Sequence, residues 1–372
     1  MRSRYPLLVP CLVLSVLLSV PAYLLSAPAK GENAPAPKGT VEKIKVHGKS
    51  LEGNLEGDSP DRDVFVYLPP SYATAKNKRY PVVYFLHGYG AHAEMYWNIM
   101  TVPDASDTLM NAGTVKEMIL VHPDAYTLYN GSMYSNSPTT GYWEDFIAKD
   151  LVEYIDTHYR TESGRDSRGL AGHSMGGYGT LRIGMKHPEV FSAIYAMSSC
   201  CLMNNPQPPG AGRGPAAPPK QAVAPDNTKQ GQGQGRGGRG GGFANVQSAQ
   251  AAAWSPNPMN PPKFFDLAVE DGKVQPAIAA KWLANSPLVM VDQYVSDLKR
   301  YRAIMMDVGL QDGLAASNKD MDASLTRLGV PHKFETYEGD HMNHVKDRFS
   351  GSVLPFFSEN LTFPAASGKK HK

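Results

Sequence analysis

A glycine-rich pentapeptide, Gly172-His173-Ser174-Met175-Gly176, limits the possible folds more than any other stretch of the 372 residues. A strand-like run, residues 168–171, precedes it and a helical run, residues 180–185, follows it. A serine at such a strand-to-helix turn has a strained backbone, and small residues flank it because neighbouring chain passes close by. The pattern predicts a raised serine hydroxyl beside the positive end of the following helix.

Eight apolar or alternating runs predict β-strands around this turn. Helical patterns lie between them, such as residues 143–159, whose apolar side chains share one face. We therefore expect an α/β fold with a mostly parallel eight-stranded sheet and helices on both faces. The first two runs follow each other without a helix, so the sheet should begin antiparallel. The runs are residues 40–46, 63–68, 82–86, 118–121, 167–171, 193–197, 303–307 and 332–337.

The N-terminus has the composition of an export signal. Residues 1–29 combine a basic start, an apolar run and an Ala-Pro-Ala end, which predicts a secretory signal peptide. We expect a secreted or periplasmic protein without stable membrane insertion once this peptide is cleaved. An uncleaved N-terminal anchor is the alternative. Residues 30–39 read as a flexible tether.

One internal segment departs from the strand and helix pattern. Residues 204–262 are rich in Pro, Gly, Ala and Gln and hold few large apolar side chains, so we expect a disordered insertion. It would divide a single globular domain into residues 40–203 and 263–362, followed by a basic tail at 363–372. An Arg-Gly-Gly repeat lies within it, but the net charge of +2 gives no reason to expect nucleic-acid binding.

The chain has only three cysteines, Cys11, Cys200 and Cys201. The last two are adjacent, and neighbours in sequence rarely form a disulfide. We therefore expect neither a disulfide framework nor a zinc site built from cysteines.

A serine becomes a strong nucleophile only when a base removes its proton and an acid orients that base. In a sheet of this kind the acid and then the histidine follow later strands. The loop after residues 303–307 contains Asp312, and the loop after residues 332–337 contains His341. We expect Asp312 to orient His341, and His341 to activate Ser174.

Each of these choices has a neighbouring alternative. Asp307 lies at the end of its strand rather than in the loop, and His344 begins a helix-like run. A metal site formed by His341 and His344 is a third possibility, although no further ligands cluster nearby in sequence.

An oxyanion in the transition state needs backbone N–H donors. We expect these donors to be Met175, directly after the serine, and Tyr89, in the glycine-containing turn after residues 82–86. His87 in the same turn is expected to have a structural role.

Aromatic residues are frequent in the loops after the third and fourth runs. Such side chains suit aromatic acyl groups or sugars at a cleft, and plain packing is the alternative. The tentative substrate contacts are Trp97, Tyr134 and Trp143.

Several short motifs together resemble the family of esterases that contains esterase D, feruloyl and acetyl-xylan esterases, enterochelin esterases and the antigen 85 mycolyltransferases. The likeness covers residues 39–203 and 282–360 and fails across the insertion. The motifs are Tyr84-Phe85-Leu86-His87-Gly88, Gly-His-Ser-Met-Gly-Gly at the elbow, Asn136-Ser137-Pro138, Glu144-Asp145, Tyr154-Ile155-Asp156, Tyr159-Arg160-Thr161 and Gly339-Asp340-His341.

The resemblance implies an α/β-hydrolase catalytic domain, with Ser174, Asp312 and His341 as a triad and Tyr89 and Met175 as the oxyanion hole. Together with the signal peptide, it implies a secreted serine carboxylester hydrolase, whose acyl-enzyme mechanism needs no metal or organic cofactor. Its substrate would be a small-molecule or polysaccharide-linked ester, such as an aromatic-acyl or acetyl ester of a carbohydrate. An acyltransferase, and a non-catalytic carbohydrate-binding protein on the same fold, are the alternatives.

Overall fold

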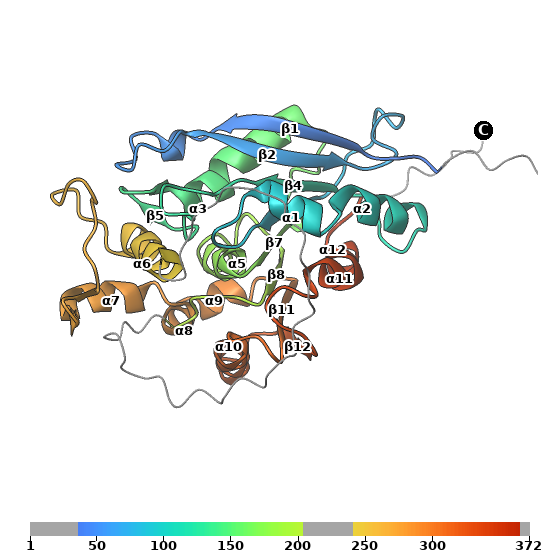
Figure 1. Ribbon diagram of the computed structural model, residues 1–372. Coiled ribbons are helices and arrows are strands. Elements are labelled where there is room, and N and C mark those ends of the chain that lie inside the picture. Colours follow the sequence, from blue (N-terminus) through green and yellow to red (C-terminus); the bar gives the residue numbers. More distant parts are fainter. Residues whose placement is uncertain (1–35, 204–240, 365–372) are drawn as a thin grey trace, which may run out of the picture. The chain divides into compact units, whose positions relative to one another are not determined.

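The computed structural model describes residues 36–203 and 241–364, and from Pro37 onward these form one unit. An eight-stranded sheet runs through this unit in the order β1-β2-β4-β3-β7-β8-β11-β12 (Figure 1). Its strands are β1 (Thr40–His47), β2 (Asp61–Leu68), β3 (Val82–Leu86), β4 (Ile119–Pro123), β7 (Arg168–His173), β8 (Ala193–Met197), β11 (Ala303–Gly309) and β12 (Lys333–Tyr337).

The pairing follows the expected change of direction. β1 is antiparallel to β2 and β2 to β4, whereas the other neighbouring pairs are parallel. The expected α/β class and mostly parallel sheet are confirmed. Every residue of β3, β7 and β8 is buried, as central parallel strands require. Two short ladders add β5 (Asn136–Ser137) to β6 (Gly141–Tyr142), and β9 (Val269–Glu270) to β10 (Lys273–Val274).

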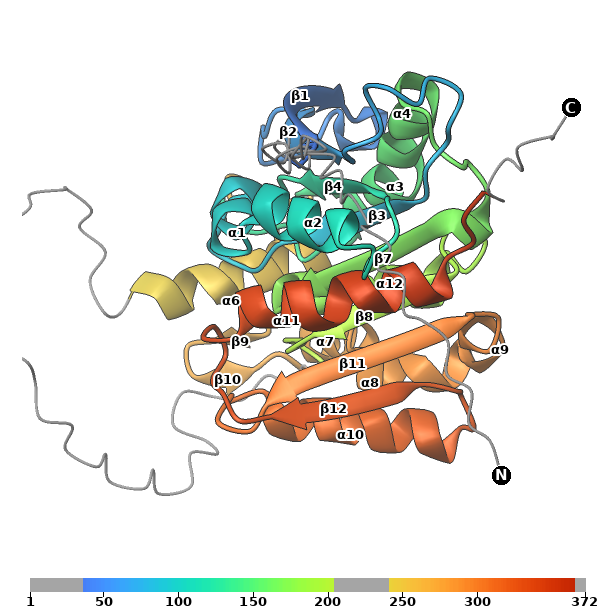
Figure 2. The ribbon, with the colours of Figure 1, turned by 90° about the vertical axis from the view of Figure 1, so that its right-hand side faces the viewer.

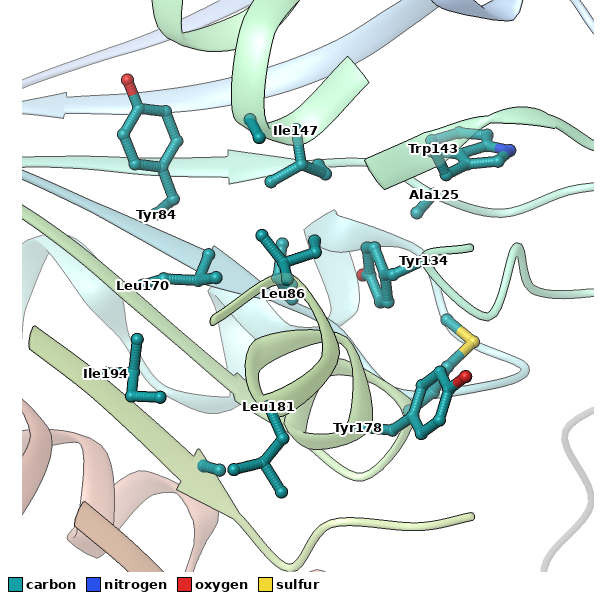
Figure 3. Packing of buried hydrophobic residues seen from close by; sticks show 14 of the residues in the cluster. Tyr84, Leu86, Ala125, Tyr134, Trp143, Ile147, Leu170, Tyr178, Leu181 and Ile194 are labelled. Carbon is teal, nitrogen blue, oxygen red and sulfur yellow. The ribbon is translucent and has the colours of Figure 1, made fainter. Parts of the chain in front are cut away.

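Helices cover both faces of the sheet. The helices in front of the sheet in Figure 2 are α1, α2, α11 and α12, and they enclose one buried cluster. A second cluster lies on the other face and includes residues of α5 together with Trp143, Tyr84, Tyr134 and Tyr178 (Figure 3).

The α-helices are α1 (Ala93–Ile99), α2 (Val102–Asn111), α3 (Trp143–Asp145), α4 (Leu151–His158), α5 (Met175–Lys186), α6 (Gly241–Trp254), α7 (Pro276–Ala284), α8 (Pro287–Met290), α9 (Val295–Leu298), α10 (Ala315–Arg327), α11 (Val345–Arg348) and α12 (Leu354–Asn360). Short 3-10 or π-helical turns are η1 (Lys49–Leu51), η2 (Phe146–Asp150), η3 (Arg165–Ser167), η4 (Val291–Gln293) and η5 (Phe349–Val353).

The expectation of disorder up to residue 262 is wrong for its described part. α6 ends in Trp254, whose side chain is 3% exposed and packs between Tyr178 and Trp282. The alanine-rich turns before Trp254 bury small side chains against the domain core. Alanine favours helix strongly, so a stretch without large apolar residues can still pack once one tryptophan anchors it. Residues 204–240 of the predicted insertion lie outside the described residues.

The predicted ends are only partly described. The signal peptide and most of the tether lie outside the described residues, as does the tail from residue 365. The last tether residues are held against α2, where the Gly39 N–H donates to Asp107 Oδ1 over 2.7 Å. The search of the described segments for a helix of membrane-spanning length and apolar character found none.

A buried ion-pair network ties α3 to α5 behind the elbow. Glu144 is 1% exposed and contacts Arg182 at 2.8 Å and Lys186 at 2.7 Å. Burial acts to raise the pKa of Glu144, but the two cations outweigh it, so the pKa is lowered. The network fixes the helix that follows Ser174 against its neighbour.

Glu56 lies in the loop before β2, and both of its carboxyl oxygens are buried without a hydrogen-bond partner among the described residues. Burial, and then the neighbouring Asp58 carboxylate, raise the pKa of Glu56 to about 9. The side chain is therefore protonated in the folded protein at neutral pH.

Replacing Glu56 with glutamine should stabilise the protein at pH 8 and have little effect at pH 5. The unfolded glutamate loses its proton near pH 4.5, whereas the folded one keeps it up to about pH 9. The free energy of unfolding of the wild type therefore falls as pH rises through this interval. Glutamine has the shape of the protonated acid and does not titrate, so its stabilising effect should be about 3–4 kcal/mol larger at pH 8 than at pH 5. Urea unfolding at both pH values measures it, and an equal difference at the two would contradict the expectation.

Candidate active site

Ser174 stands at a tight turn between β7 and α5. Its backbone has φ +59° and ψ −114°, a strained conformation for a residue other than glycine. A Cβ atom on Gly176 would lie 1.9 Å from the Leu86 carbonyl oxygen, and one on Gly172 would lie 2.4 Å from the Gly176 oxygen. The two glycines are therefore required by close chain contacts, and the turn has the form that the pentapeptide predicts.

The structure brings Ser174, His341 and Asp312 together. The His341 Nε2 atom lies 2.9 Å from Ser174 Oγ, and its Nδ1 atom lies 2.8 Å from Asp312 Oδ2. With Nδ1–H donating to the carboxylate, Nε2 is left to accept the serine proton. The three side chains form one chain of hydrogen bonds, which runs from the loop after β11 through the loop after β12 to the elbow.

The environment of Asp312 keeps its carboxylate ionised. Burial acts to raise the pKa of Asp312, but hydrogen bonds from His341 and from the Leu314 N–H lower it more, and the net pKa is below its usual value. The Asp312 side chain is only 2% exposed, and water competes little for its bond to His341.

Asp307 and His344, the two alternatives, have other partners. Asp307 is fully buried and accepts hydrogen bonds from Arg348 Nε and the Tyr195 hydroxyl, each over 2.7 Å. Burial raises the pKa of Asp307. His344 precedes α11 and contacts Asp347 at 2.9 Å. Neither residue is hydrogen-bonded to Ser174 or His341.

The turn after β3 lies against Ser174. A Cβ atom on Gly88 would lie 3.3 Å from Ser174 Cβ, and one on Gly131 would lie 2.6 Å from Met175 Sδ and 2.9 Å from Tyr89 Cδ2. Met175 is the first residue of α5, a position whose N–H has no partner within the helix. This neighbourhood is compatible with Tyr89 and Met175 as oxyanion donors, which remains a prediction.

His87 holds the same turn in place through two hydrogen bonds. Its ring is 1% exposed, and Nε2 accepts the Ala125 N–H over 2.8 Å while Nδ1 contacts the Gly88 carbonyl at 2.9 Å. Burial lowers the pKa of His87, so the neutral ring can donate one hydrogen bond and accept the other. These contacts agree with the structural role expected for it.

The three tentative substrate contacts are corrected by the structure. Trp97 packs against Phe65 beneath α1, with a distance of 5.3 Å between ring centroids. Tyr134 is fully buried and donates its hydroxyl to the His87 carbonyl, and Trp143 is 1% exposed and donates to the Thr140 carbonyl. All three are core residues: Trp97 in α1, Trp143 at the start of α3 and Tyr134 in the loop before β5 are all buried.

Sequence reasoning missed the apolar side chains that are exposed at this edge of the sheet. They come from the loops after β4, β8, β11 and β12, whose C-terminal ends meet beside the elbow. No periodicity marks single apolar residues in loops, so the sequence carried little signal for them. They are Leu128, Met203, Leu310 and Met342, which are 40–61% exposed.

The two adjacent cysteines also lie beside Ser174. The Cys200 N–H donates to the Ser174 carbonyl over 3.1 Å, and the Sγ atoms of Cys200 and Cys201 are 2.7 Å apart. Nothing in the sequence alone places this pair at the site.

Comparisons with known proteins agree with this geometry. Residues 59–348 match the model of the family described as "Putative esterase". An endo-1,4-beta-xylanase/feruloyl esterase of Xylanibacter ruminicola is 33% identical over 132 residues, which are 34% of this chain and 18% of that protein. An esterase of Mycobacterium tuberculosis is 33% identical over 141 residues, which are 36% of this chain and 28% of that protein. The matches thus span less than a third of these relatives.

Solved structures share the fold across most of the chain. A ferulic acid esterase superposes with a TM-score of 0.62 at 23% identity, over 88% of this chain and all of that one. An S-formylglutathione hydrolase from Agrobacterium tumefaciens gives 0.55 at 14% identity, over 88% of this chain and 98% of that one. The fold is the expected α/β-hydrolase fold. Because the family model covers residues 59–348, more than half of the chain, this protein belongs to that esterase family.

Proposed function

We propose that this protein is a serine carboxylester hydrolase that works through an acyl-enzyme. The observation that carries the proposal is the continuous hydrogen-bond chain from Ser174 through His341 to Asp312 at a strained elbow. Such a chain supplies a nucleophile, a base and an orienting acid in the geometry that acyl transfer needs. Family membership supports the same reaction class.

Acylation begins when His341 Nε2 accepts the Ser174 proton and Oγ attacks the ester carbonyl carbon. Asp312 holds His341 in the required tautomer and stabilises the imidazolium that forms. The N–H groups of Met175 and Tyr89 would bind the oxyanion. His341 then returns the proton to the alcohol as the carbon–oxygen bond breaks, which leaves the acyl group on Ser174.

Deacylation repeats these steps with water. His341 removes a proton from water, the resulting hydroxide attacks the acyl carbon, and Ser174 Oγ leaves and regains the proton. The acid product is released. No step in this sequence requires a metal ion or an organic cofactor.

We further propose that the substrates are aromatic-acyl or acetyl esters of carbohydrates, with feruloyl esters tested first. Support comes from the relatives and neighbours whose names contain feruloyl or ferulic acid esterase. The exposed apolar residues Leu128, Met203, Leu310 and Met342 offer non-polar contact area at the same edge of the sheet. The proposed export through residues 1–29 would bring the protein to extracellular polysaccharides.

Labelling with a fluorophosphonate probe, read by peptide mass spectrometry, tests the proposal. Such probes phosphonylate serines that an adjacent base activates. We expect one adduct on Ser174 in the wild type and none in the His341→Ala variant. Labelling of other serines only, or none in a folded wild type, would overturn the proposal. Release of ferulate and acetate from their sugar esters then distinguishes the two substrate groups.

A further inference from the structure

We propose that His173, the residue before the nucleophile, positions the catalytic base through a hydrogen bond to its backbone. This inference rests on the proposed function, because it assigns a role within the same site. His173 is the last residue of β7 and is fully buried. Its side chain faces the loop that carries His341.

The contact between the two histidines is direct. The His173 Nε2 atom lies 2.8 Å from the carbonyl oxygen of His341, and a carbonyl can only accept, so Nε2 carries the proton. The two imidazole rings also pack together with their centroids 4.7 Å apart. The end of β7, which precedes Ser174, is thereby hydrogen-bonded to the backbone of His341.

Tyr96 in α1 fixes the other side of the ring. Its hydroxyl lies 2.7 Å from His173 Nδ1, which must accept because Nε2 is the protonated nitrogen. The same hydroxyl packs against the turn after β3, where a Cβ atom on Gly88 would lie 2.3 Å from it. A buried chain from Tyr96 through His173 to His341 therefore connects the base loop with the turn beside the nucleophile.

The His173 ring is neutral in the folded protein. Burial, and then the proximity of His341, lower the pKa of His173 to about 3. A neutral His173 keeps one donor and one acceptor, which match its two partners. It also adds no positive charge beside the imidazolium that forms on His341 during catalysis.

The base loop needs such an anchor because much of it is exposed. His341 itself is 35% exposed at its side chain, and Asp340 and Met342 on either side of it are exposed as well. The Asp340 side chain accepts the N–H groups of Met342 and Asn343, but these bonds stay within the loop. The bond from His173 instead holds the His341 backbone to the sheet, and small displacements of a base cost rate rather than binding.

The experiment compares His173→Leu with His173→Gln, using 4-nitrophenyl acetate as substrate. Leucine fills similar space without a donor, whereas the glutamine Nε2 can still reach the His341 carbonyl. We expect leucine to lower kcat about tenfold with KM changed less than twofold, and glutamine to restore kcat to within about threefold of wild type.

Tyr96→Phe supplies an independent test of the chain. It removes the hydroxyl that sets the His173 tautomer, so kcat should fall about threefold alone but not further in the His173→Leu background. Folding is checked by thermal unfolding of each variant. If the His173→Leu variant does not fold, the kcat values of His173→Gln and Tyr96→Phe still test the role of His173.

Several results would overturn the inference. They are a folded His173→Leu variant with kcat within twofold of wild type, a glutamine variant as slow as the leucine variant, and fully additive effects of His173→Leu and Tyr96→Phe. A wild type that neither cleaves the ester nor accepts the fluorophosphonate probe would instead overturn the proposed function, and this inference with it.

Discussion

Replacing Ser174 with alanine should lower kcat for ester cleavage by about 10⁴-fold or more while the protein remains folded. Alanine removes only the Oγ atom that lies 2.9 Å from His341 Nε2. The backbone bond from the Ser174 N–H to the Met197 carbonyl is retained, so the elbow keeps its shape. Steady-state hydrolysis of 4-nitrophenyl acetate, with circular dichroism of both proteins, measures the effect.

Ser199→Ala is the matched control for this substitution. Ser199 is a buried serine that follows β8 at the same edge of the sheet, and its Oγ has no hydrogen-bond partner among the described residues. Its removal should change kcat less than about threefold, since it takes no part in the hydrogen-bond chain. If the Ser174→Ala variant were folded and turned over at the wild-type rate, Ser174 would not be the nucleophile.

The sheet could be predicted from the sequence because its determinants are local. Runs such as residues 82–86 and 193–197 are apolar throughout, and only strands buried on both faces combine that composition with that length. The C-terminal ends of parallel strands meet at one edge of the sheet. The partners of the elbow serine are therefore expected in the loops after later strands, where Asp312 and His341 occur. The three residues do converge there.

The parts that sequence reasoning missed depend on contacts between distant segments. The sequence does not distinguish an aromatic residue that lines a cleft from one that packs in the core. Only the tertiary structure shows that Trp143 and Tyr134 are both buried in the core. Trp254 likewise lies in a segment of small and polar residues, and its burial depends on Tyr178 and Trp282 from other helices. In the sequence His173 is only one position of the elbow, because its partners Tyr96 and His341 are far away in the chain.

Replacing Asp312 with asparagine should lower kcat about 10⁴-fold with little loss of stability. The amide can place an NH₂ group toward His341 Nδ1, which favours the tautomer that carries the proton on Nε2 and cannot accept from Ser174. The remaining amide oxygen can still accept the Leu314 N–H, so the loop after β11 should keep its conformation. Hydrolysis of 4-nitrophenyl acetate and urea unfolding measure the two quantities.

Asp307→Asn is the matched comparison and should give the opposite result. Asp307 is buried with Arg348, and removing its charge leaves the guanidinium without that counter-charge in a protected environment. Arg348 keeps Glu335 as a second counter-charge at 2.7 Å, so the free energy of unfolding should fall by about 1–3 kcal/mol, while the folded fraction keeps its kcat. The two aspartates lie five residues apart on β11 and the loop after it. Both substitutions therefore disturb the same region of the structure, which makes their effects comparable. If kcat were lost in Asp307→Asn and kept in Asp312→Asn, Asp307 would be the residue that orients His341. The expected pattern instead assigns Asp312 to catalysis and Asp307 to the stability of the fold.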